Sequence, residues 1–238
     1  MIWQLFLAHF LADYPLQTSW MVHNKWRPYV LIAHVSIHFL VMLLLAGAAR
    51  AAVWPYLLAL ALAHLLIDAG KITVHRLRPG WVIGPYVVDQ MIHYLTIFVT
   101  GAWIGRAVGP VTLPFSSEAA ILAVAYLAGT YVWFISERIF AHAETSYREE
   151  VQAQLWPRMG TRAAMLSVML WALLWPGGLG GNLAGGKSGD EVCGLPLSMV
   201  SVAASVPYLS GKYRQRALLT DISVSLVLAI FAGAAIWW

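Results

Sequence analysis

Four pairs of polar residues in the first hundred positions combine metal-binding side chains with a spacing that suits one helix face. Each pair joins residues four apart, and the pairs are His9 and Asp13, His34 and His38, His64 and Asp68, and Asp89 and His93. Residues four apart project from the same side of a helix, so each pair points in one direction. Charged groups inside a membrane helix cost about 2.5–3.5 kcal/mol on insertion scales, so these pairs require a partner or a function.

Imidazole and carboxylate side chains that converge from four helices form a suitable site for a transition metal. Imidazole binds zinc, iron, copper or nickel, and carboxylates neutralise the charge of the ion. A His and Asp set without thiolate is typical of a catalytic metal with an open position rather than of a closed structural zinc. We therefore expect one or two divalent ions, zinc or iron. The expected ligands are His9, Asp13, His38, His64, Asp68, Asp89 and His93.

A metal at this site would support hydrolysis. It would lower the pKa of a bound water to about 7 and polarise a phosphoryl or acyl oxygen. A side chain that stays unligated would act as the general base for that water. The candidates for this catalytic role are His34, Asp13 and Asp89.

The elements that must position these residues are membrane helices. The chain has 238 residues, of which 60% are hydrophobic and 11% charged, with a mean hydropathy of +0.69. Soluble domains contain about 25% charged residues, so the composition predicts an all-α polytopic membrane protein. A span needs about 20 apolar residues, which predicts seven or eight transmembrane helices. Their ranges are 2–22, 29–48, 53–72, 84–105, 118–140, 162–177, 195–210 and 217–237.

Basic residues indicate the orientation of these spans. Twelve of the 15 Lys and Arg residues fall in the odd-numbered connections, which the positive-inside rule assigns to the cytoplasm. All four polar pairs then lie towards the cytoplasmic side of a multi-pass protein of a bacterial inner membrane. The net charge of +4 follows from the same bias, so we expect no nucleic-acid partner.

An internal repeat relates the first two helices to the next two. The stretch "LAHFLAD" at 7–13 returns as "LAHLLID" at 62–68, an offset of 55 residues. The repeat predicts a four-helix bundle of two duplicated hairpins, related by a pseudo-two-fold axis along the membrane normal. Four histidines then form a deeper layer, and four residues lie one turn nearer the cytoplasm. The deeper layer is His9, His38, His64 and His93, and the other is Asp13, His34, Asp68 and Asp89.

The chain divides into a part that carries the site and a part that does not. We expect residues 1–105 to form the duplicated membrane domain and 106–238 to add further membrane helices. The second part includes a cytoplasmic amphipathic segment at 136–162 and an outer Gly-rich loop at 177–194. Within that loop, "GNLAGGKS" at 181–188 has P-loop spacing, but a loop after a membrane helix lacks the strand that this motif requires.

Three stretches resemble an uncharacterised family of bacterial integral membrane proteins, a domain of unknown function. "HFLADYPLQTSW" is similar to the opening signature of that family, and "HLLIDAGK" and "DQMIH" are similar to its later blocks. The resemblance covers about residues 1–100 and implies a membrane location without an established reaction. The H-x-x-x-D spacing is similar, more distantly, to that of bacterial membrane-bound metal-dependent hydrolases.

These observations favour a metal-dependent hydrolase that acts on a lipid-like or lipid-linked substrate at the cytoplasmic side. A cationic rim of His23, Lys25 and Arg27 would suit an anionic headgroup. The alternative is a non-enzymatic membrane component. It would be a metal or proton transporter, a haem-binding subunit, or a structural subunit with an interhelical polar network. The expected partners are the lipid bilayer and further membrane subunits.

Overall fold

The described part of the protein consists of helices and the loops that join them. The computed structural model describes residues 1–174 and 211–237, and no strand occurs within these ranges. The predicted all-α class is therefore confirmed for this part of the chain. The chain forms two compact units, Met1–Val124 and Ala125–Trp238, whereas the sequence analysis divided it after residue 105.

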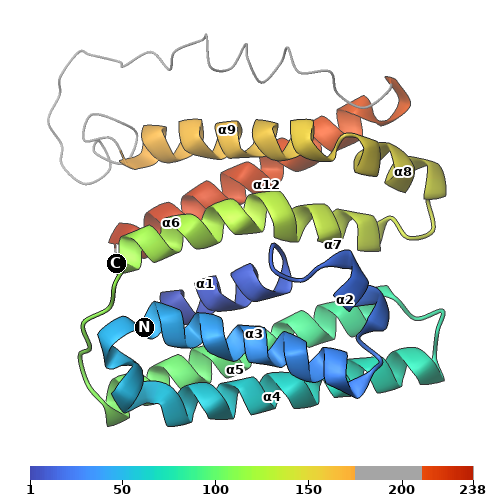
Figure 1. Cartoon of the computed structure of the whole chain (residues 1–238). Helices are drawn as coiled ribbons and strands as arrows, with labels where there is room; N and C mark the ends of the chain where they lie inside the picture. The colour runs from blue at the N-terminus through green and yellow to red at the C-terminus, as the bar shows by residue number, and fades with distance from the viewer. Residues whose placement is uncertain (175–210, 238) are drawn as a thin grey trace, which may run out of the picture. The chain divides into compact units, whose positions relative to one another are not determined.

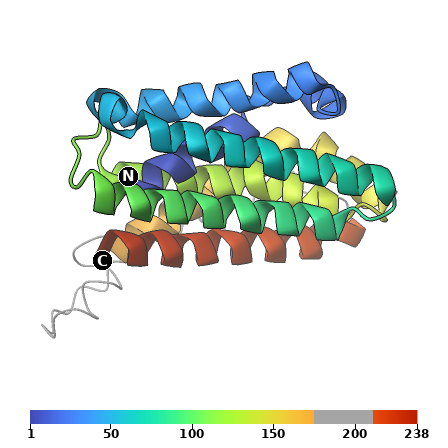
Figure 2. The ribbon, with the colours of Figure 1, turned by 90° about the horizontal axis from the view of Figure 1, so that it is seen from below.

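The first unit is a bundle of four helices with a short fifth one at its end. The helices are α1 (Ile2–Asp13), α2 (Ser19–Asn24), α3 (Pro28–Ala46), α4 (Arg50–Leu77) and α5 (Ile83–Ala107). α1 and α4 each pack against both α3 and α5, so the four long helices close into a ring (Figure 1). Seen from below, α3, α4 and α5 run alongside one another in front of α1 (Figure 2).

The connection between α3 and α4 depends on one glycine. A 3-10 turn at Gly47–Ala49 joins the two helices, and Gly47 has a φ of +56°. A Cβ at this position would lie 2.8 Å from Cδ of Pro114, so both the backbone conformation and the close approach require glycine.

The predicted first span is broken after Asp13. Pro15 has no amide hydrogen to continue the helix, and α2 begins anew with Thr18 as its N-cap, whose Oγ1 accepts from the Met21 amide at 3.3 Å. The 12 residues of α1 rise only about 18 Å, which is less than a membrane thickness. At the equivalent position of the repeat, Gly70 lets α4 continue, so α1 and α4 differ in length.

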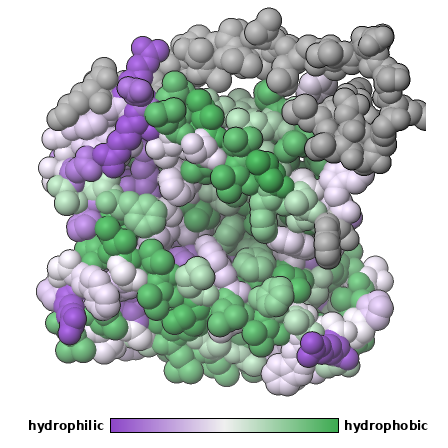
Figure 3. All heavy atoms as spheres, turned by 180° about the vertical axis from the view of Figure 1, so that it is seen from behind, coloured by the Kyte–Doolittle hydropathy of each residue, from purple (hydrophilic) through white to green (hydrophobic). Residues whose placement is uncertain are grey.

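Four described segments are long and apolar enough to cross a membrane. They are Pro28–Leu77, which contains α3 and α4, Ile83–Ala107, Ser117–Phe140 and Tyr213–Trp237. Hydrophobic side chains cover the middle of the first unit, and hydrophilic ones gather near its ends (Figure 3). These features are consistent with a membrane protein. The predicted number of seven or eight spans and the pseudo-two-fold duplication stay predictions.

Some predicted features lie outside the described residues. These are the Gly-rich loop at 177–194 with its "GNLAGGKS" motif at 181–188, the span at 195–210 and the last part of the span at 162–177.

The second unit combines the end of α6 with the helices that follow it. The elements are α6 (Ser117–Leu127), a π-helical turn (Ala128–Val132), α7 (Trp133–Phe140), α8 (Thr145–Ala153), α9 (Leu155–Leu174) and α12 (Gly211–Trp237). α9 packs along α12 and against the π-helical turn. Helices α7, α8 and the start of α9 occupy the segment 136–162 that was predicted to be amphipathic. Arg158 and Arg162 are two of the twelve basic residues counted in the odd-numbered connections, and both are buried.

Candidate metal centre

Four side chains from three helices bring one potential ligand atom each to a common point. They are Asp13 at the end of α1, His34 and His38 on α3, and His64 on α4, and their ligand atoms all lie within 4.8 Å of one another. The three imidazoles are buried, and Asp13 is 11% exposed. The one-turn spacing of His34 and His38 places both rings on the face of α3 that meets α1 and α4.

Four of the six distances between these atoms are close to those of a tetrahedral ligand set. Oδ1 of Asp13 lies 3.0 Å from Nε2 of His38, 3.1 Å from Nε2 of His34 and 3.9 Å from Nε2 of His64. The Nε2 atoms of His34 and His64 are 3.3 Å apart. Zinc ligands at about 2.0–2.2 Å from the ion are roughly 3.3–3.6 Å from one another in a tetrahedron. The four distances given above, 3.0–3.9 Å, lie around this range.

Gln17 holds His34 in the tautomer that a metal requires. With its oxygen turned towards the site, the Gln17 amide accepts from Nδ1 of His34 at 3.2 Å and from Nζ of Lys25 at 3.0 Å, and donates to the Asp13 carbonyl at 3.1 Å. Because Nδ1 then carries the proton, Nε2 presents a lone pair to the other ligand atoms. The break after Asp13 is what brings Gln17 here. Spacing along the sequence did not indicate that Gln17 would orient a ligand.

A second group shares His64 with the first. It contains His64, Asp68 and His93, whose ligand atoms also lie within 4.8 Å of one another. Nδ1 of His93 donates to the Asp89 carbonyl at 2.8 Å, and its Nε2 is buried without a hydrogen-bond partner among the described residues. Oδ2 of Asp68 lies 3.4 Å from Nε2 of His64 but only 2.8 Å from Nζ of Lys25. An ammonium group thus already neutralises this carboxylate.

The histidines predicted to form the deeper layer line one small cavity. The cavity measures about 10 Å³, about the space that one water occupies. His9 lies outside both ligand groups, with its Nε2 3.4 Å from Oδ2 of Asp13, and its ring stacks on that of His93 at 5.1 Å. The cavity is lined by these two rings together with those of His38 and His64.

Asp89 does not join the potential ligands. Its Oδ2 accepts from Nζ of Lys71 at 2.6 Å and from Nε2 of Gln90 at 3.0 Å, and Oδ1 lies 3.7 Å from Nδ1 of His93. The structure thus places Asp89 beside a potential ligand, as the partner of a lysine, rather than among the ligand atoms. Its predicted role as ligand or base has no support in these contacts.

The charged residues around the two ligand groups would favour an anionic ligand once a metal is bound. Three carboxylates, Asp13, Asp68 and Asp89, face two ammonium groups, Lys25 and Lys71. The cluster therefore has one excess negative charge, which a divalent cation would turn into one excess positive charge. Local spacing in the sequence did not indicate either lysine partner, because each ion pair joins different elements.

A separate polar cluster lies inside the second unit. Arg158 and Arg162, one turn apart on α9, pair with Glu137 of α7 and Asp221 of α12 at 2.7–3.2 Å. Two cations and two anions balance, and all four side chains are buried. The Tyr147 hydroxyl donates to Glu137 at 2.5 Å. Burial and this contact raise the pKa of Tyr147. The cluster was missed because its partners are up to 63 positions apart.

Comparison with known proteins places the potential ligands within one family match. Residues 1–118 match the model of a family described as "Protein of unknown function (DUF3307)". This finding confirms the expected relation to an uncharacterised family, and the match covers α1 to α5 and both ligand groups. No curated protein and no solved structure matches the chain.

Proposed function

We propose that the protein is a metal-dependent hydrolase of lipid-like or lipid-linked substrates, located in a bacterial inner membrane with its site towards the cytoplasm. The observation that carries the proposal is the spacing of 3.0–3.9 Å among the ligand atoms of Asp13, His34, His38 and His64. Such a set of nitrogen and carboxylate donors suits zinc or iron.

The burial of the four side chains suggests how the roles divide. The imidazoles of His34, His38 and His64 are at most 5% exposed and come from the interior of long helices. Asp13 is more exposed and ends a short helix beside the loop at 14–18. We assign the metal to the three histidines, as in catalytic zinc sites that keep one position open. Asp13 either occupies the fourth position or serves as the general base.

We propose one ion rather than two. His64 belongs to both ligand groups, so the groups compete for it. Lys25 lies 2.8 Å from Asp68 and already supplies a positive charge at the second group. The first group, in contrast, has no ammonium group within ion-pair distance of its carboxylate among the described residues.

The metal content of purified protein tests the site. Wild type purified in mild detergent should hold about one zinc or iron ion per chain, measured by elemental mass spectrometry, and His64→Ala should lose it. His75→Ala is the matched control, because His75 lies on the same helix but is exposed. Folded wild type without metal, or equal metal in His64→Ala and wild type, would overturn the proposed centre.

Turnover tests the reaction separately. Wild type in nanodiscs should hydrolyse a member of a panel of phospholipids and lipid phosphates, with products identified by mass. Asp13→Asn should keep the metal on its three histidines yet lose about 10²–10⁴-fold in kcat if Asp13 is the base. Bound metal without turnover of any lipid would instead favour a transporting or structural component.

A further inference from the structure

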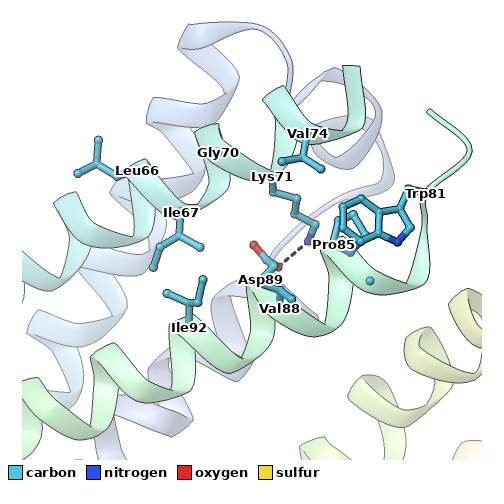
Figure 4. Close-up of a pocket in the computed structure, with 11 residues that line it drawn as sticks. Leu66, Ile67, Gly70, Lys71, Val74, Trp81, Pro85, Val88, Asp89 and Ile92 are labelled. Atoms are coloured by element: carbon cyan, nitrogen blue, oxygen red, sulfur yellow. Dashed lines mark hydrogen bonds and ion pairs between the residues drawn. The ribbon is translucent and has the colours of Figure 1, made fainter. Parts of the chain in front are cut away.

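We propose that a groove between α4 and α5 binds the hydrocarbon chain of an anionic membrane lipid, with the lipid headgroup at Lys71. The part of this inference that makes the lipid a substrate rests on the proposed function; the binding site itself does not. The groove has a volume of about 360 Å³, within the range of about 300–1,000 Å³ that is usual for ligand pockets. Its lining comes from residues 66–74 of α4 and from 81–92, which include Trp81 before α5 and the start of α5 (Figure 4).

The groove is lined by apolar side chains except for one ion pair. Lys71 of α4 reaches across to Asp89 of α5, near the point where α5 begins (Figure 4). Leu66, Ile67 and Ile92 line the apolar end that is further from the helix ends. Val74, Trp81 and Pro85 lie on the other side of the ion pair. Both helices belong to segments able to cross a membrane. A lipid with its chain along the apolar end would therefore place its head at Lys71.

The exposed partner of the ion pair is the cation. The side chain of Lys71 is 34% exposed, whereas that of Asp89 is only 3% exposed. An approaching ligand therefore meets an ammonium group and not a carboxylate, which favours an anionic head. Arg78 adds a second cation near this end, because its guanidinium lies 5.9 Å from the centre of the Trp81 ring. Trp81 lines the groove and is 50% exposed, as an aromatic residue at a membrane interface would be.

The ion pair in the groove is connected to the candidate metal centre through Asp89. Its side chain contacts Lys71 in the groove, and its backbone carbonyl accepts from Nδ1 of His93 in the second ligand group. Only Asp89 would thus lie between a headgroup held by Lys71 and His93 of the second ligand group. This arrangement suggests that a lipid substrate enters sideways from the membrane between α4 and α5.

Gly70 offers a clean way to fill the groove. It lines the groove, and a Cβ at this position would meet no atom within 4 Å. Gly70→Trp should therefore occupy the space of the chain without forcing the helices apart. Gly105→Trp is the matched control, because Gly105 lies on α5 outside the groove and a Cβ there is equally free. Gly84 is unsuitable, since a Cβ would lie 2.6 Å from the Trp81 indole nitrogen.

Native mass spectrometry of the detergent-purified full chain provides the test. The protein is incubated with phosphatidylglycerol or with phosphatidylcholine of identical acyl chains, and retained lipid is counted. We expect wild type and Gly105→Trp to retain phosphatidylglycerol about fivefold better, as one lysine contact implies. Gly70→Trp should lose retention of both lipids by about tenfold. Equal lipid retention in Gly70→Trp and wild type would overturn the groove as the binding site.

A second variant tests the headgroup position. Lys71→Gln combined with Asp89→Asn removes both charges and leaves no unpaired buried carboxylate. It should lose most of the preference for phosphatidylglycerol, with Arg78 left to supply the remainder, whereas a preference equal to that of wild type would refute the role of Lys71. Metal content is measured in the same samples. Lipid retention without metal would overturn the proposed hydrolase and leave the groove as a lipid site. Bound metal without lipid retention would overturn the groove and leave the metal centre.

Discussion

Oδ1 of Asp13 lies 3.0 Å from Nε2 of His38, although the two residues are 25 positions apart and belong to different helices. Asp13 is the last residue of α1, and His38 lies in the middle of α3. The same oxygen lies 3.1 Å from Nε2 of His34, so one carboxylate faces both imidazoles of the α3 face. The packing of α1 on α3 therefore determines whether the candidate metal centre forms.

Removal of the metal should destabilise the protein. A ligand present at 100 times its Kd stabilises the folded state by about 2.7 kcal/mol, so a chelator should lower the Tm of detergent-purified wild type. His38→Ala lacks one ligand of the set, and its Tm should not respond to the chelator. His75→Ala should respond like wild type. An equal chelator effect in His38→Ala would show that His38 is not a ligand.

Loss of Gln17 should weaken metal binding without removing a ligand. The Gln17 amide orients His34 and supports the Asp13 backbone, and loss of such an outer partner costs about 10–100-fold in metal affinity. Gln17→Ala should show this loss in a competition titration with a chelator. Asn24→Ala is the control, because the only described hydrogen bond of the Asn24 side chain goes to the Trp20 carbonyl of its own helix turn. Unchanged affinity in Gln17→Ala would contradict the assigned tautomer of His34.

Replacement of Lys25 by an apolar residue should open the second ligand group. Nζ of Lys25 lies 2.8 Å from Asp68, and without it the carboxylate regains a need for a positive charge. We expect Lys25→Met to bind more than one divalent ion per chain under excess zinc, whereas Arg27→Met binds as wild type does. Elemental analysis after gel filtration measures the ratio. A ratio in Lys25→Met equal to that of wild type would mean that Lys25 does not exclude a second ion.

The buried charge cluster of the second unit should contribute to stability but not to metal binding. Asp221→Asn removes one anion while Arg158 and Arg162 stay buried, and loss of one partner of a buried pair costs about 3–5 kcal/mol. Chemical unfolding should show this loss, and Glu149→Gln on the exposed side of α8 should show almost none. The metal content of folded Asp221→Asn should equal that of wild type. A loss below 1 kcal/mol, the usual range of surface pairs, would contradict the assigned burial.

The contribution of sequence is clearest at α3. The four-residue spacing of His34 and His38 is a local property of the helix, so it predicts a shared face before any neighbour is known. The same reasoning paired His64 with Asp68, whose oxygen lies 3.4 Å from the imidazole nitrogen. It also anticipated that the segments carrying three of the pairs, α3, α4 and α5, would be helices long and apolar enough to cross a membrane, because hydrocarbon permits no unpaired backbone groups. The segment that carries His9 and Asp13 is too short to do so.

The contacts of Asp89 and Gln17 could not be predicted from spacing along one helix. Spacing placed Asp89 with His93 on one face, but the side chain of Lys71 from α4 reaches its Oδ2 first. Gln17 gained a role because the chain breaks after Asp13 and turns back over the site. Neither contact follows from helix periodicity, since both depend on what a neighbouring element presents.

The sequence alone thus determined that this is a helical membrane protein and which polar residues share a helix face, because hydropathy and the period of the helix are properties of each segment. The tertiary structure decided which of those faces meet. Asp13, His34, His38 and His64 form a set with metal-ligand spacing, while Asp68 and Asp89 pair with lysines. Distances of about 3 Å between side-chain atoms of different helices depend on how the helices rotate and pack against one another. The sequence of a single helix does not determine that packing.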